Sequence, residues 1–150
     1  LLMARGARDW RTAQPFDRWT FPDLHPGFHR IFPVEWCREN GVEPVVADSI
    51  LNRTPMGKRT EVVIDGYAPA QYLSRIQSKS LLDDAEFDTV LATHELTTDL
   101  LHQSDFANFL RDRRSRYVGM VEYAMDKPVV RDVDDSDYSG GEEGPNAFRE

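Results

Sequence analysis

The feature that most constrains this chain is a helical repeat of apolar residues near its C-terminal end. Between Phe106 and Met125, apolar side chains recur at spacings of three and four residues. This spacing places them on one face of a helix. The pattern therefore predicts a long amphipathic helix that stops before Lys127-Pro128 and contributes an apolar stripe to the core.

Cap residues predict shorter helices elsewhere. A proline at the first helical position and Asn-Gly at the end predict a helix over 33–41. A second helix is predicted over 70–76, and a third runs from Asp83 or Asp84 to about His94. The second half of the chain is therefore expected to be mostly helical.

The first half of the chain is expected to hold the β structure. A strand over 50–56, with a turn at 57–59, is predicted to belong to a small hairpin around 29–56. Residues 1–6 resemble the last turn of a helix that ends at glycine, and the prolines of 7–28 predict irregular or short extended structure. The expected fold class is α+β, mostly helical.

Composition limits the domain count and the compartment. A chain of 150 residues fits one domain. The single cysteine, Cys37, cannot form an internal disulfide, which points to a reducing compartment such as the cytoplasm. No apolar run approaches the ~20 residues that cross a bilayer, and no signal-peptide pattern opens the chain. Secreted, membrane and disulfide-framework classes are therefore excluded.

The net charge of −8 is unevenly distributed. Residues 132–150 carry seven acids and one base, a net of −6, which leaves −2 on residues 1–131. The terminal segment has too little apolar surface to offset its ordering entropy, so we expect a domain over 1–131 and an acidic flexible tail over 132–150. The near-neutral domain is compatible with a localised nucleic-acid site. Because the chain does not open on methionine, we expect the C-terminal part of a larger protein.

Three polar residues have a spacing that is typical of a catalytic metal site. His29 enters an Ile-Phe-Pro turn, Asn52 follows in a later segment, and Glu61 stands nine residues beyond it. This is the layout of a ββα-metal (HNH-type) nuclease site. Such a site needs one hard divalent cation with few protein ligands, so that phosphate and water complete the shell. It also needs a base that activates water and an amide that holds the base in place.

The surrounding segments carry a family resemblance. The matching residues are 9–12, His29, 31–33, 48–50, Asn52, Thr54, Thr60, 68–69, 72–73, His94, 105–106, 109–110, Arg113 and 124–127. They resemble D-I-H-H-I-F-P, D-S-I-x-N-x-T, T-N-R-x-I-G-x-x-A-P-S-x-Y-L and the helical end of the C-terminal HNH-type domain of GmrSD-type restriction enzymes. SspE-like phage-defence proteins share these motifs. The resemblance covers residues 1 to about 131 and implies an HNH-like ββα-metal core with surrounding helices.

The resemblance also implies roles for the site residues. His29 and Glu61 would hold Mg²⁺, or Mn²⁺ in its place, and Asn52 would orient the site. Glu61 replaces the asparagine of the family and can still bind a hard cation. Arg30 stands where the family carries its general-base histidine, and an arginine stays protonated near neutral pH. Arg30 is therefore expected to meet phosphate, and the site is expected to work slowly.

Other charged residues have more than one interpretation. The expected further contacts to DNA phosphates are Arg53, Lys58 and Arg59. The arginines at 111, 113, 114 and 116 either contact phosphates or, as we favour, form a solvated helix face. His25 is a weaker candidate for the missing base, and His94 is expected to be structural.

The leading hypothesis is a metal-dependent DNA endonuclease or nickase domain of a bacterial phage-defence or restriction protein. Its implied partners are double-stranded DNA, including modified phage DNA, and an N-terminal sensor and nucleotide-hydrolysing domain of the same protein. No membrane partner is expected, and the location would be the bacterial cytoplasm. The alternative is an inactive nuclease-derived domain that binds DNA or a partner protein. A third possibility is a helical structural module in which His29, Asn52 and Glu61 are too far apart to share a cation.

Overall fold

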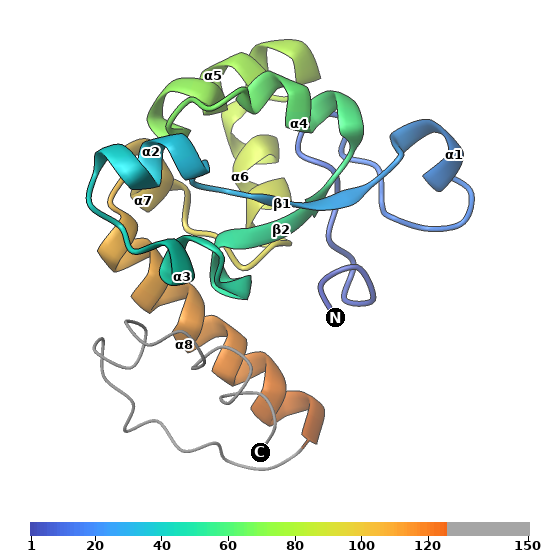
Figure 1. Cartoon of the computed structure of the whole chain (residues 1–150). Helices are drawn as coiled ribbons and strands as arrows, with labels where there is room; N and C mark the ends of the chain where they lie inside the picture. Colours follow the sequence, from blue (N-terminus) through green and yellow to red (C-terminus); the bar gives the residue numbers. More distant parts are fainter. Residues whose placement is uncertain (126–150) are drawn as a thin grey trace.

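The computed structural model describes residues 1–125. The predicted tail over 132–150 and the predicted boundary at 131 lie outside the described residues. In chain order (Figure 1) the elements are α1 (Phe21–Leu24), β1 (Gly27–Arg30), α2 (Val34–Glu39), α3 (Pro44–Ala47), the 3₁₀ helix η1 (Ile50–Asn52), β2 (Arg53–Met56), α4 (Lys58–Ile64), α5 (Pro69–Ser80), α6 (Asp84–Ala92), α7 (Thr98–His102) and α8 (Phe106–Met125).

A two-stranded antiparallel sheet lies at the centre of the site region. β1 pairs with β2 in a register that places His29 opposite Thr54 and Arg30 opposite Arg53. Only Gly57 separates β2 from α4, and α4 lies beside the hairpin in Figure 1. The prediction of an α+β chain, mostly helical with a small hairpin, is confirmed at this level.

Two of the predicted helices follow their sequence signals closely. α8 covers the whole predicted span of 20 residues. α6 begins with a capping box, in which the Asp83 carboxylate accepts the Glu86 N–H at 2.8 Å and the Glu86 carboxylate accepts the Asp83 N–H at 2.9 Å. α2 and α5 also form where predicted, although α5 continues to Ser80. Within residues 1–125, no helix combines the length and the apolar character that spanning a membrane requires.

The prediction for residues 50–59 is partly wrong. Residues 50–52 form η1, capped by the hydroxyl of Ser49, and β2 begins only at Arg53. The predicted turn at 57–59 is instead the start of α4. The Gly57 N–H donates to the carboxylate of Asp9, 48 residues earlier in the chain, at 2.7 Å. A contact so distant in sequence leaves no local pattern, and this is why the helix was missed.

The predicted end of a helix over 1–6 is also wrong, because these residues form turns. Three short helices, α1, α3 and α7, were not predicted; they contain four, four and five residues. Helices of this length are too short to display a 3.6-residue apolar repeat.

Within residues 1–125 the buried apolar residues form two clusters. The larger one contains the buried aromatic side chains Trp10, Phe32, Tyr72, Phe87 and Phe109. The smaller one packs the N-terminal segment against α8 through Leu2, Ala7, Phe16, Leu24 and Met120. The stripe of α8 was predicted to be core along its whole length, but Met125 at its end is 56% exposed because the smaller cluster stops at Met120.

Asp9 fixes the N-terminal segment to the start of α4. Its buried carboxylate accepts hydrogen bonds from the Gly57 N–H and from the Thr60 hydroxyl. It also accepts from the backbone N–H groups of Arg11 and Thr12. A buried carboxylate is tolerated when its oxygens are satisfied in this way. Asp9 thereby sets the position from which α4 presents Glu61.

His94 connects the N-terminal segment to β2. Its Nδ1 accepts the hydroxyl of Thr54 at 2.5 Å, and its Nε2–H donates to the carbonyl oxygen of Arg8 at 2.6 Å. These contacts assign a neutral ring with the proton on Nε2. Burial lowers the pKa of His94 to about 4, and the Arg113 cation acts in the same direction. The prediction that His94 is structural agrees with its complete burial.

The lowered pKa of His94 predicts a dependence of stability on pH. Between about pH 6.5 and pH 4 the unfolded chain binds a proton at His94 that the folded chain does not, so stability falls as the pH falls through this window. The loss amounts to roughly 3 kcal/mol at pH 4, with a smaller contribution of the same sign from His29. Urea denaturation at pH 7.5, 6, 5 and 4 measures it. His102→Gln, at an exposed position, should leave the profile unchanged, and constant stability over the window would contradict the prediction.

Candidate functional site

His29 and Glu61 lie within electrostatic range of one another. His29 lies on β1, and Glu61 lies in the first turn of α4, which follows β2 after Gly57. The Glu61 carboxylate raises the pKa of His29, while Lys58 and Arg53 act in the opposite direction. This electrostatic influence links the two side chains predicted as metal ligands, although α2, α3, η1 and β2 separate their elements in sequence.

The protonation state of His29 suits metal binding. Burial is the largest influence on the imidazole, and the net effect lowers the pKa of His29 below its ordinary value of 6.5. The neutral ring, which can offer a nitrogen lone pair to a metal, therefore predominates at pH 7. Glu61 accepts a hydrogen bond from Lys58 Nζ at 3.2 Å. Exposed ion pairs of this kind are weak, so the carboxylate remains available to a cation.

Gly27 provides the space for the His29 ring. A Cβ atom on Gly27 would lie 2.9 Å from Nε2 of His29, closer than such contacts allow. The family motif carries an acid at this position, and that side chain would displace the imidazole from its present place. The glycine at 27 and the orientation of His29 are therefore coupled.

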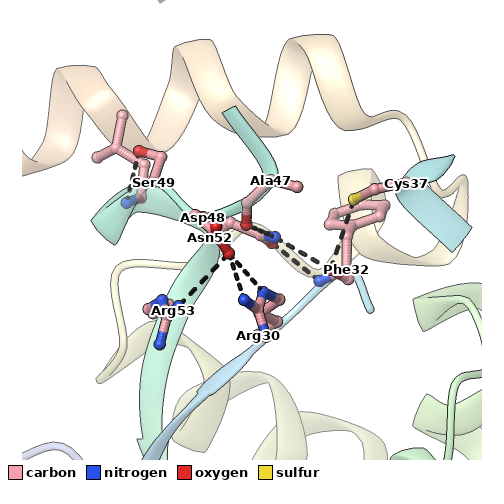
Figure 2. Close-up of polar contacts among 9 residues, drawn as sticks. Arg30, Phe32, Cys37, Ala47, Asp48, Ser49, Asn52 and Arg53 are labelled. Atoms are coloured by element: carbon pink, nitrogen blue, oxygen red, sulfur yellow. Dashed lines mark hydrogen bonds and ion pairs between the residues drawn. The ribbon is translucent and has the colours of Figure 1, made fainter. Parts of the chain in front are cut away.

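Arg30 makes an ion pair with Asp48 (Figure 2). Its Nε donates to Asp48 Oδ1 at 3.1 Å, and its Nη2 makes a second contact with the same oxygen. Nη2 of Arg53 lies 3.5 Å from that oxygen. The pKa of Asp48 is lowered, chiefly by the hydrogen bond from Arg30. The side chains of two opposed residues on β1 and β2 thus converge on one carboxylate oxygen.

Asn52 is buried, and its amide binds backbone groups on both sides of the site. Its Oδ1 accepts the Phe32 N–H at 2.9 Å, and its Nδ2 donates to the carbonyl oxygens of Phe32 and Ala47 at 3.0 and 2.9 Å. These bonds join the turn after Arg30 to the residue before Asp48 (Figure 2). Asn52 is therefore a positioning residue, and both of its N–H donors are already used.

Three further residues shape this region and were not predicted as site residues. The Tyr72 hydroxyl donates to the Ile31 carbonyl at 2.6 Å, and Cys37 Sγ donates to the Phe32 carbonyl at 3.6 Å. Asp48 completes the set as the partner of the two arginines. Asp48 and Tyr72 stand in the matching motifs, so the sequence marked their positions but did not reveal their partners.

The other predicted phosphate contacts lie at the beginning of α4. Lys58 is exposed and pairs with Glu61. Arg59 is also exposed and lines a cavity of about 10 Å³, room for about one water molecule, together with Asp9, Arg11, Asp23, Leu24, Gly57 and Thr60. Both side chains therefore keep charge at the surface near Glu61.

For Arg113, both interpretations of the arginine group on α8 are wrong. Its side chain is 1% exposed, and its Nη1 donates to the carbonyl oxygens of Leu51 and Arg53, both at 2.7 Å. Its Nη2 donates to the carbonyl oxygen of His94 at 3.1 Å and to the hydroxyl of Thr54 at 3.3 Å. Burial lowers its pKa to about 10, so it stays charged. Arg113 is a structural cation beneath the hairpin.

The donor set limits the kind of cation site that fits. Within residues 1–125, no group of three or more His, Cys, Asp and Glu side chains is arranged to hold a metal ion. The predicted site therefore depends on His29 and Glu61 alone. A carboxylate oxygen suits Mg²⁺ or Mn²⁺ when water and phosphate supply the other ligands, whereas an imidazole nitrogen is a donor that transition-metal ions prefer.

Comparisons of the chain with protein-family models, with curated proteins and with solved structures found no match. The likeness to GmrSD-type enzymes therefore remains a resemblance of motifs. The function is therefore inferred from the residues of this chain and from their contacts.

Proposed function

We propose that this chain is an HNH-type DNA nuclease domain of a bacterial defence protein, in which His29 and Glu61 hold a divalent cation and the absence of a base makes cleavage slow. The observation that carries the proposal is the position of a neutral imidazole on β1 within electrostatic reach of a carboxylate on α4. Two antiparallel strands followed directly by a helix are the order of elements that a ββα-metal unit requires. The partners proposed with it are double-stranded DNA and an N-terminal sensor domain, in the cytoplasm.

In this proposal, different side chains bind the cation and the DNA backbone. A bound Mg²⁺ or Mn²⁺ would supply positive charge to the phosphodiester. His29 contributes a nitrogen donor, and the negative charge of Glu61 favours a dication. Lys58 and Arg59 place further positive charge beside Glu61, where it attracts the DNA backbone. Arg30 cannot remove a proton from water, because its guanidinium stays protonated.

One observation favours the second candidate, a nuclease-derived domain that binds DNA or a partner protein without cutting. Arg30 stands at the position of the family's base, and its side chain is committed to Asp48. This ion pair fills the place from which a base would act. In this case the cation and the basic residues would serve recognition alone.

His29→Ala is expected to abolish metal-dependent nicking and to weaken Mn²⁺ binding by at least about tenfold, because it removes one of the two ligands proposed within residues 1–125. Nicking of supercoiled plasmid with Mg²⁺ or Mn²⁺ measures the first effect. Calorimetric titration with Mn²⁺ measures the second without relying on activity. The wild-type chain is expected to nick slowly.

His102→Ala serves as the matched control, because His102 is exposed on α7. It should bind Mn²⁺ and nick plasmid as the wild type does. Mn²⁺ binding without nicking under any metal would favour the non-cutting candidate. If the wild-type chain neither binds Mn²⁺ nor nicks, both the cation site and the enzyme proposal are wrong.

A further inference from the structure

Arg30 and Arg53 are held at a short distance from one another by the register of the hairpin. They are directly opposed residues on β1 and β2. Like charges at opposed positions of adjacent strands repel and destabilise the pair. An anion placed between the two guanidinium groups removes that repulsion. In the structure the anion is the Asp48 carboxylate, which both arginines contact (Figure 2).

We propose that Arg30 and Arg53 form a phosphate-binding site that the Asp48 carboxylate occupies until a phosphate group displaces it. The identification of the phosphate as part of a DNA backbone rests on the proposed function. The anion site itself requires only the two arginines and no metal ion.

The contacts of Asp48 are those of a replaceable ligand. Its side chain is 54% exposed, and those of the two arginines are 33% and 34% exposed. Both arginines contact the same oxygen, Oδ1, rather than using the two oxygens in parallel. Arginine binds oxyanions most strongly through two parallel N–H···O bonds. A phosphate group has enough oxygens to offer such a pair to each guanidinium, which Asp48 does not do.

The backbone around Asp48 is held in place independently of its side chain. The carbonyl of Ala47, the preceding residue, accepts the amide of Asn52, and the Asp48 N–H donates to the carbonyl of Pro44 at 3.0 Å. Displacement therefore needs only a rotation of the Asp48 side chain toward solvent. Because the loop itself stays fixed, the carboxylate competes with every incoming phosphate and raises the concentration at which the site fills.

Asp48→Asn is expected to tighten binding of inorganic phosphate by roughly three- to tenfold, because it removes the competing charge and keeps the size of the side chain. The measurement is a titration followed by the phosphate-dependent rise in Tm, with EDTA present throughout. A labelled duplex oligonucleotide, followed by fluorescence anisotropy in the same buffer, forms the second arm.

Asp112→Asn is the matched control. Asp112 pairs with Arg116 on α8, and its replacement changes the net charge by the same amount. Equal gains in both variants, or no gain in Asp48→Asn, would overturn the proposal. Adding Arg53→Gln to Asp48→Asn should remove the gain, and a gain that survives this change would also overturn it.

The two arms distinguish the sources of the phosphate group. Tighter binding of both probes supports a site for the DNA backbone, and tighter binding of inorganic phosphate alone supports a site for a free phosphate group. Because both titrations contain EDTA, the proposed cation site takes no part in either of them. Failure of the anion site is thereby separated from failure of the proposed metal site.

Discussion

Replacing Arg30 with histidine is expected to accelerate nicking of plasmid DNA by about 10²–10⁴-fold in the presence of Mg²⁺ or Mn²⁺. This range is the usual contribution of a positioned general base. Position 30 is the last residue of β1, directly after His29, and matches the position of the base in the family motif. The turn that follows it is fixed by Asn52 and Tyr72, so a new imidazole would stand on backbone that is already ordered.

Asp48 should help a histidine at position 30 to act as a general base. With Arg30 removed, the Asp48 carboxylate keeps only the 3.5 Å contact with Arg53 and can accept a hydrogen bond from the new imidazole. A carboxylate in that role holds a histidine in one orientation and stabilises its protonated form. The rate should therefore rise with pH through a pKa at or somewhat above the ordinary histidine value of about 6.5.

Two controls define the cause of the acceleration. Arg30→Gln removes the positive charge without adding a base, and Arg53→His places an imidazole at the opposed position on β2. Neither is expected to gain activity. A rate equal to that of Arg30→Gln, in a variant that still binds Mn²⁺, would show that position 30 does not lie beside the reacting group.

Local patterns were sufficient to predict the elements that are stabilised locally. The apolar repeat of α8 and the capping residues of α6 act within a few positions of one another. α4 is different, because the N–H group of Gly57, the residue before it, and the Thr60 hydroxyl within it donate to Asp9. No pattern near residue 57 reveals this partner. The start of α4 is therefore anchored by a tertiary contact rather than by a local cap.

The candidate site was predictable to a similar extent. The motifs identified His29, Asn52 and Glu61, and the charge of Glu61 influences the pKa of His29, while their role as a site stays a prediction. The sequence did not reveal that Asp48 neutralises Arg30, because that pairing depends on how the loop before η1 folds back on β1. The prediction for Arg113 was also wrong. A basic residue that stands among other basic residues on a helix normally faces solvent, but Arg113 is buried.

Arg113→Met is expected to lower the free energy of unfolding by about 3–5 kcal/mol, the largest stability change predicted for a single substitution in this chain. The guanidinium donates to three backbone carbonyl oxygens and one hydroxyl, which come from η1, from β2 and from the segment after α6. Methionine fills much of the volume but offers no donor. Each carbonyl left without a partner costs the free energy of its lost hydration.

Urea denaturation of the variant measures the change, and Arg116→Met is its control. Arg116 lies on the same helix, but its side chain is 40% exposed and pairs with Asp112, so its loss should cost less than about 1 kcal/mol.

If Arg113→Met does not fold, Arg113→Lys keeps the measurement possible, because its ammonium retains the charge and can reach some of the acceptors. Arg113→Lys should fall between the wild type and Arg113→Met. Arg113→Lys should also speed hydrogen exchange at the β1–β2 amides. The reason is that two of the groups that accept from Arg113, the Arg53 carbonyl and the Thr54 hydroxyl, belong to β2. A loss below about 1 kcal/mol in Arg113→Met would show that the buried cation does not support the hairpin.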